Sequence, residues 1–209
     1  VLIEDRVSFW GHNYMQIHNC ILSDAGVAVS MNPNSHLTIT RSLIYFTSMG
    51  INSWFWAVPS LYNVTMDFVS TPLTFYRSWG YVYNSTFSRA DSIVATWGNW
   101  GWGSAYGSNN NFYLYNRMAR PNDRGGYPYV AFGNSMYVDP MFTESLPHGV
   151  EYHLREGSPL IDAGVNVGLP YNGLAPDIGY FETDYALSVP ELIEVLAESF
   201  EEAPVEEFK

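Results

Sequence analysis

Met15-Gln16-Ile17-His18-Asn19-Cys20-Ile21-Leu22 is followed, 22 residues later, by the similar stretch Leu37-Thr38-Ile39-Thr40-Arg41-Ser42-Leu43-Ile44. A second offset of 22 and then one of 21 continue the match over residues 61–87. Two apolar columns result, the first with Ile17, Ile39, Leu61 and Val82, the second with Leu22, Ile44, Met66 and Phe87. A polar column of Asn19, Arg41, Asn63 and Asn84 lies between them. The chain therefore contains a repeat of about 22 residues.

The repeat has the properties of a coil of short strands. Apolar and polar residues alternate within each unit, which is the period of a strand, and a unit is shorter than the roughly 30 residues of a βαβ motif. Asparagine at a bend tolerates a left-handed backbone and can hydrogen-bond along a stack. We predict an all-β, right-handed parallel β-helix of about five or six coils. An antiparallel sandwich is the alternative, but the only Asn-Gly hairpin signal, Asn172-Gly173, lies outside the repeat.

Glycine and tryptophan interrupt the repeat after Arg89. The tract from Trp97 to Gly107 reads WGNWGWGSAYG. Because glycine disfavours strands and supplies unusual dihedral angles, we predict a loop over 91–111. A second loop is expected over 120–126, and the last coil over 130–138.

Composition excludes several classes of function. The net charge of the 209 residues is −12, and Lys209 is the only lysine. Residues 182–209 hold nine acids and one base, so this tail carries −8 and the rest of the chain −4. We therefore expect no nucleic-acid partner and no polybasic membrane contact, and no apolar run is long enough for a membrane span. A single cysteine, Cys20, excludes an intrachain disulfide.

Residues 139–182 carry a resemblance to a known group of proteins. The motifs are Asp139-Pro140-Met141-Phe142, Tyr152-His153-Leu154, Gly157-Ser158-Pro159-Leu160-Ile161-Asp162-Ala163-Gly164 and Ala175-Pro176-Asp177-Ile178-Gly179-Tyr180-Phe181-Glu182. The segment resembles the C-terminal closing segment of secreted pectate-lyase-like (family-nine-type) β-helix proteins and related bacterial surface proteins. The resemblance implies the β-helix architecture and an extracellular or cell-surface location. It does not separate enzymes from inactive relatives.

Three regions are expected along the chain: β-helix coils over 1–138, the closing segment over 139–182, and an acidic tail over 183–209. The start at Val1-Leu2-Ile3 has no basic region or cleavage site, so we expect further coils upstream. In the tail, Ser188-Val189-Pro190-Glu191 is typical of a helix start. Leu192, Val195, Leu196 and Phe200 would form one apolar stripe, which either caps the open end of the coils or docks another subunit.

The repeats offer few residues for catalysis. A β-helix lyase needs a basic residue to abstract a proton and acids to hold Ca²⁺. The candidates are Arg41, Arg77 and Arg89 as bases and Asp67 and Asp91 as acids. The two acids do not share a column, and arginine is a poor base. We therefore assign no catalytic set and lean towards a chain that is not an enzyme.

Asp162 and Asp177 are the only candidate metal ligands in the closing segment. They are expected to accept backbone N–H groups in turns, with Ca²⁺ binding as the alternative. No other cofactor is indicated.

Aromatic residues make up 17% of the chain. Trp97, Trp100, Trp102 and Tyr106, together with Trp79, would form either a sugar-stacking platform or a contact with other subunits. The expected function is therefore a non-catalytic surface module that binds polysaccharide or other protein subunits. The alternative is the C-terminal portion of a polysaccharide (pectate-type) lyase whose catalytic coils lie upstream.

Overall fold

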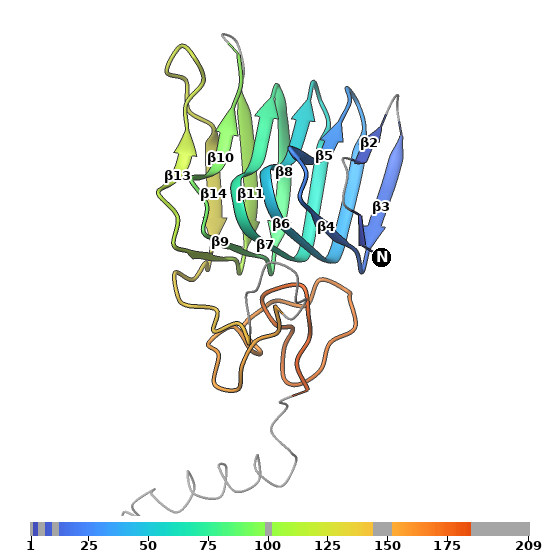
Figure 1. The fold of residues 1–209 in the computed structure, drawn as a ribbon, viewed down its shortest axis with the longest axis vertical. Coiled ribbons are helices and arrows are strands. Elements are labelled where there is room, and N and C mark those ends of the chain that lie inside the picture. The colour runs from blue at the N-terminus through green and yellow to red at the C-terminus, as the bar shows by residue number, and fades with distance from the viewer. Residues whose placement is uncertain (1, 4–6, 10–12, 99–101, 144–151, 185–209) are drawn as a thin grey trace, which may run out of the picture.

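The chain folds into a parallel β-solenoid of about five turns, with about 22 residues in each turn (Figure 1). The computed structural model describes residues 2–3, 7–9, 13–98, 102–143 and 152–184. All paired strands in these ranges are parallel and belong to one 14-stranded sheet, which coils around a central core. The predicted β-helix is thereby confirmed and the antiparallel sandwich is excluded. No helix in the described ranges is long and apolar enough to cross a membrane.

Each turn contributes to three faces, which we call A, B and C. Face A contains β3 (Tyr14–His18), the first parts of β6 (His36–Trp54) and β7 (Val58–Tyr76), β8 (Ser78–Tyr83), β11 (Gly103–Ser108) and β14 (Tyr129–Gly133). Face B contains β1 (Leu2–Ile3), β4 (Ile21–Ser23), the middle of β6 and β7, β9 (Thr86–Ser88) and β12 (Asn111–Tyr113). Face C contains β2 (Val7–Phe9), β5 (Val27–Met31), the ends of β6 and β7, β10 (Ser92–Thr96) and β13 (Arg117–Arg120).

The strand register places the two predicted apolar columns inside the solenoid. Ile17, Ile39, Leu61 and Val82 are paired through successive turns of face A and are all buried. Leu22, Ile44, Met66 and Phe87 do the same on face B. Phe87 stacks on Phe112 of the next turn of face B at 5.5 Å between ring centroids, and Phe112 also contacts the ring of Phe132 from face A at 5.2 Å. Like residues therefore pack on like residues along the axis.

The predicted polar column forms the corner between faces A and B. Asn19, Arg41, Asn63, Asn84, Asn109 and Asn134 occupy it, with φ values between 46° and 54°. A left-handed residue costs about 1–2 kcal/mol unless its side chain can compensate locally, as asparagine can. This requirement explains why asparagine recurs at the corner.

The corner between faces B and C is also left-handed, but it lacks asparagine. Asp24, Phe46, Phe68, Arg89 and Leu114 occupy it, with φ values between 49° and 54°. Here the side chains stack along the axis: the rings of Phe46 and Phe68 lie 4.9 Å apart, and the Arg89 guanidinium lies 3.9 Å from the Phe68 ring centre. These contacts offset the backbone strain.

The loop predicted over 91–111 is wrong for most of its length, since Ser92–Thr96 already forms strand β10, which pairs with β7 and β13. Gly103–Ser108 forms strand β11, which pairs with β8 on one side and β14 on the other. The glycines are needed because the neighbouring turn lies so close. A Cβ atom on Gly103 would lie 2.5 Å from the Phe75 Cβ atom, and one on Gly107, where φ is 155°, would lie 1.7 Å from the Val82 carbonyl oxygen. Tight packing, not a loop, explains these glycines.

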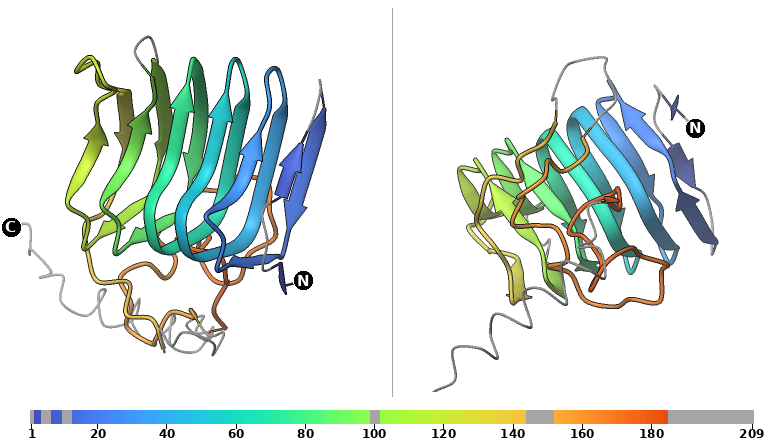
Figure 2. Two further views of the ribbon diagram at one scale, coloured as in Figure 1. Left: turned by 45° about the horizontal axis from the view of Figure 1, so that its top comes forward. Right: turned by 90° about the horizontal axis from the view of Figure 1, so that it is seen from below.

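The closing segment lies along the flank of the solenoid and not over its end (Figures 1 and 2). Its described residues, 139–143 and 152–184, contain no strand and run across face B. Tyr152 packs with Leu43 and Tyr45, while Leu160 and Ile178 form a small core of their own with Leu154. Residues 185–209 of the acidic tail lie outside the described residues, including the predicted helix of Leu192, Val195, Leu196 and Phe200.

Side chains of the A–B corner hold the closing segment. The Asn84 side-chain amide donates to the Val165 carbonyl at 2.7 Å, and its oxygen accepts the Val165 N–H at 2.9 Å. Asn63 Nδ2 donates to the Asp177 carbonyl at 2.9 Å, and Asn109 Nδ2 to the Ala163 carbonyl at 3.2 Å. The corner asparagines therefore bind the segment as well as supporting the backbone.

Replacing Asn84 with alanine should test this double role. Asn84→Ala removes both hydrogen bonds to the Val165 backbone and raises the cost of the left-handed backbone at residue 84. We expect the free energy of unfolding to fall by about 2–4 kcal/mol in urea titrations. Asn134 has the same backbone conformation but is exposed, so Asn134→Ala should cost only about 1 kcal/mol. Equal losses in the two variants would contradict the clamping role of Asn84.

Candidate functional site

The outer surface of face A is aromatic and uncharged. None of its described strands contains an aspartate, glutamate, lysine or arginine. Side chains alternate along a strand, so Gly103 and Ala105 point inward while Ser104 and Tyr106 point outward. By the same alternation, Trp79 and Tyr81 of β8 and Tyr129 of β14 lie on the outer surface. We call this surface the aromatic face.

Rings of successive turns contact one another along the aromatic face. The centroids of Tyr81 and Tyr106 lie 5.9 Å apart, and those of Tyr106 and Tyr129 lie 5.8 Å apart. The rings of Trp79 and Trp102 are stacked and nearly parallel, with 6.4 Å between their centroids and an interplanar angle of 7°. Trp56 meets both tryptophans edge-on. Trp56, Trp102 and Tyr129 are 51%, 43% and 61% exposed, so the rings form an accessible surface and not a core.

A hollow of about 510 Å³ lies in the aromatic face, lined by Trp79, Tyr81, Trp102, Ser104 and Tyr106. The strand register explains its position. Ser104 pairs with Trp79 in the turn before and with Tyr129 in the turn after. A small residue thus interrupts a column of large rings, and its hydroxyl lies at the floor of the gap.

The structure brings together three of the five predicted aromatic residues. Trp79, Trp102 and Tyr106 line the hollow. Trp97 is exposed but is not among the lining residues, and Trp100 lies outside the described residues. Sequence reasoning missed Tyr81 and Tyr129. Tyr81 follows Trp79 by two residues, so strand alternation alone would have placed both rings on one surface.

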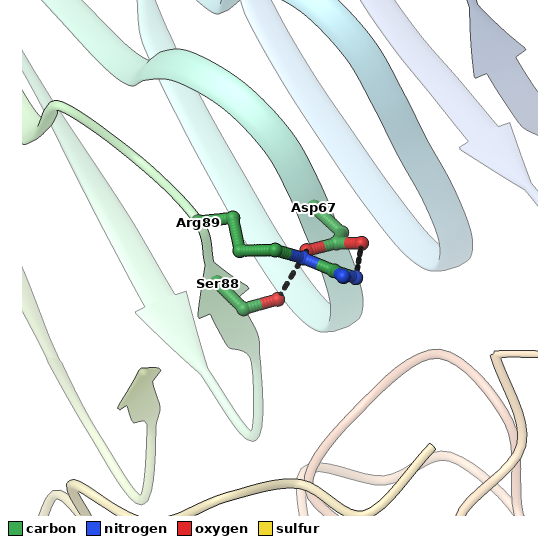
Figure 3. Close-up of polar contacts among 3 residues, drawn as sticks. All are labelled: Asp67, Ser88 and Arg89. Atoms are coloured by element: carbon green, nitrogen blue, oxygen red, sulfur yellow. Dashed lines mark hydrogen bonds and ion pairs between the residues drawn. The ribbon is translucent and has the colours of Figure 1, made fainter. Parts of the chain in front are cut away.

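Two of the predicted catalytic residues, Asp67 and Arg89, form an ion pair (Figure 3). The Arg89 Nε atom donates to the Asp67 Oδ1 atom at 2.7 Å, its Nη2 atom binds Oδ2, and the Ser88 hydroxyl donates to Oδ1 at 2.6 Å. Asp67 is fully buried, and Tyr152 of the closing segment packs nearby, where burial and the Asp67 charge raise the pKa of the tyrosine. The pair joins adjacent turns beneath the closing segment.

The other predicted catalytic residues lie apart from this pair. The Arg77 guanidinium lies 5.9 Å from the centre of the Phe55 ring, at the corner that leads into face A. Asp91 accepts a hydrogen bond from Asn116 at 3.2 Å and lies 3.8 Å from Arg117 near face C. Arg41 occupies the A–B corner, where its charge acts on Glu182 of the closing segment. The structure therefore does not gather the five predicted residues into one site.

A second cavity, of about 420 Å³, lies at the seam between the solenoid and the closing segment. Arg89 and Arg155 line it together with Asp139 and Tyr113, whose hydroxyl donates to Asp139 at 3.2 Å. Groups of both signs are present, and Arg89 already binds Asp67. This seam cavity lacks the single chemical character of the aromatic face.

Asp162 and Asp177 accept backbone N–H groups, as predicted. The Asp162 Oδ1 atom accepts from Leu174 at 2.8 Å and from Ala175 at 3.1 Å. The Asp177 carboxylate accepts from Asp162 at 2.9 Å and from Thr183 at 2.8 Å. Within the described ranges, no group of three His, Cys, Asp or Glu side chains is placed to hold a metal ion. Binding of Ca²⁺ at the two aspartates stays a prediction.

Glu182 joins the closing segment to the A–B corner. One carboxylate oxygen accepts a hydrogen bond from the Asn63 side chain at 3.3 Å, and the other accepts from the Asp177 N–H at 3.2 Å. Burial raises the pKa of Glu182 to about 7, and it also raises the pKa of Asp177. The negative charge of Glu182 is therefore disfavoured in the folded state.

Comparison with known proteins places the chain in no family. No family model matches it, and no significant match is found among the curated proteins or the solved structures. The parallel β-solenoid fold stands on the structure itself, and the relationship to pectate-lyase-like proteins stays a prediction.

The attachment of the closing segment should depend on pH. The raised pKa of Glu182 means that the folded state binds a proton more tightly than the unfolded state does. The stabilisation is therefore complete below the ordinary glutamate pKa and is lost as the pH rises through about 7. We expect the hydrogen-exchange protection of residues 160–182 to fall severalfold between pH of about 5 and about 8, after allowance for partial exposure.

Glu182→Gln provides the control for this prediction, because it keeps the hydrogen-bonding shape and removes the titration. Its protection of residues 160–182 should change much less over the same interval. Equal pH dependence in Glu182→Gln and the parent chain would show that another group is responsible.

Proposed function

We propose that this chain is a non-catalytic, polysaccharide-binding module of an extracellular or surface protein, and that it binds a neutral glycan on the aromatic face. One observation carries the proposal: rings from successive turns line an exposed, hollowed surface whose strands contain no charged residue. Tryptophan and tyrosine combine an apolar ring face with a polar edge, which matches the apolar and hydroxyl-bearing sides of a sugar ring.

The absence of charge on face A favours a neutral ligand over an acidic one. A uronate carboxylate would lose water on binding and would find no cation within these strands to compensate for it. A neutral sugar needs only hydroxyl partners, and Ser104, Tyr81 and Tyr106 carry hydroxyl groups at the hollow. The rings are held by a continuous parallel ladder, so the surface is formed before the ligand arrives.

The aromatic face could instead bind another protein subunit, since aromatic residues are enriched at protein interfaces. The two ligands differ in the area that they contact. A sugar ring occupies the hollow and hydrogen-bonds through its hydroxyl groups, whereas a protein subunit covers the whole aromatic face. The lyase alternative depends on coils upstream and on the resemblance of residues 139–182. Arg89 does not support the lyase alternative, because its guanidinium is already paired with Asp67.

Binding to soluble polysaccharides tests the proposal. Hydroxyethyl cellulose and glucomannan serve as neutral probes, and polygalacturonate, with and without Ca²⁺, serves as the acidic probe. We expect the chain to be retarded in native gels that contain a neutral probe. Trp79→Ala and Trp102→Ala should each weaken binding about tenfold, which corresponds to about 1.4 kcal/mol.

Tyr171→Ala is the matched control, because it removes an exposed ring from the closing segment. It should leave binding unchanged. Retardation by polygalacturonate alone would contradict the neutral ligand and revive the lyase alternative. Loss of a self-associated or subunit-bound state in Trp79→Ala, with no polysaccharide binding in the parent chain, would establish a protein interface.

A further inference from the structure

We infer that a single pyranose ring of the neutral glycan sits in the gap over Ser104, and that the size of residue 104 decides what the aromatic face accepts. The inference rests on the proposed function and adds to it a defined subsite and a specificity-determining residue.

The gap follows from the register of three turns. Trp79, Ser104 and Tyr129 are paired in one outward column, so two large side chains flank one small one. Adjacent strands lie about 4.8 Å apart, which places the flanking positions about 10 Å from each other. A flat ring in van der Waals contact on both sides needs about 4 Å to each neighbour. The register therefore leaves room between positions 79 and 129 for one six-membered sugar ring, and of these two residues Trp79 lines the hollow.

Side chains also bound the gap along the strand. Tyr106, the next outward residue of β11, closes one side, and Trp102, at the corner before β11, closes the other. Both rings contact members of adjacent turns, Tyr106 with Tyr81 and Tyr129, and Trp102 with Trp79. These contacts restrict the motion of the Tyr106 and Trp102 side chains before a ligand binds. Binding therefore costs little side-chain entropy.

The floor of the gap carries polar groups suited to a sugar. The Ser104 hydroxyl can both donate and accept a hydrogen bond, as can the Tyr81 and Tyr106 hydroxyls. Among Trp79, Ser104 and Tyr129, only Ser104 lacks a ring, so the space opens at this turn. The gap thus combines stacking walls with a small polar floor.

Enlarging residue 104 should block the subsite without disturbing the fold. Ser104→Tyr would continue the outward column from Trp79 to Tyr129 on a surface position, where tyrosine is well suited to a strand. We expect the affinity for hydroxyethyl cellulose or glucomannan to fall at least about tenfold, or by about 1.4 kcal/mol. Ser104→Ala keeps the space and should lose only about threefold, as expected for one neutral hydrogen bond.

Ser30→Tyr provides a matched control, since Ser30 is a half-buried residue in the middle of β5 on face C. It adds the same side chain on another face and should leave affinity unchanged. Thermal unfolding of all three variants verifies that each is folded. A methyl glycoside of the constituent sugar should displace the polymer from the parent chain at high concentration, because one ring carries much of the contact.

The outcomes separate this inference from the proposed function. If Ser104→Tyr is folded and binds the neutral polymer as tightly as the parent chain does, the ligand lies elsewhere on the aromatic face and the subsite is wrong. If Ser104→Ala loses as much as Ser104→Tyr, the hydroxyl and not the space is decisive, and the size-based inference fails. If the parent chain binds no neutral polymer, the proposed function itself is wrong.

Discussion

The left-handed corner residue is the constraint on which this structure depends. Each turn must change direction at the same place as the turn before it, because otherwise the parallel ladders on faces A and B would lose register. Residues from Asn19 to Asn134 meet this requirement with nearly identical backbone angles. Once the corners coincide, the inward residues stack as columns and the outward residues stack as surfaces. Both the core and the aromatic face follow from that alignment.

Much of the solenoid was predictable because its inward columns consist of similar residues at a nearly constant spacing. Ile17, Ile39 and Leu61 are 22 residues apart, and their pairing confirms the prediction. The prediction failed where the spacing lengthens to 25 residues, between Ser78 and Gly103. Strand β11 contains Gly103 and Gly107, and glycine in a sequence usually indicates a loop. Here the glycines are present because Phe75 and Val82 of neighbouring strands lie so close to them.

The chemical character of the candidate site was predictable from the sequence, but the full set of residues that form it was not. The abundance of tryptophan pointed to Trp79, Trp102 and Tyr106, yet only the register shows that Tyr129 belongs with them and that Ser104 leaves a gap. The pairing of Asp67 with Arg89 was missed for a similar reason. The search for a Ca²⁺ site asked whether the acids share a column, whereas the partner of Asp67 is a basic residue one turn away, at a separation of 22 residues.

The path of the closing segment bears on how the solenoid comes apart. In a simple repeat protein each turn contacts only its neighbours, and the stack can unzip from an end. Here Asn63, Asn84 and Asn109, in three successive turns, all bind residues between 163 and 177. These turns are therefore coupled along the axis as well as through the sheet, and they should unfold as one cooperative block.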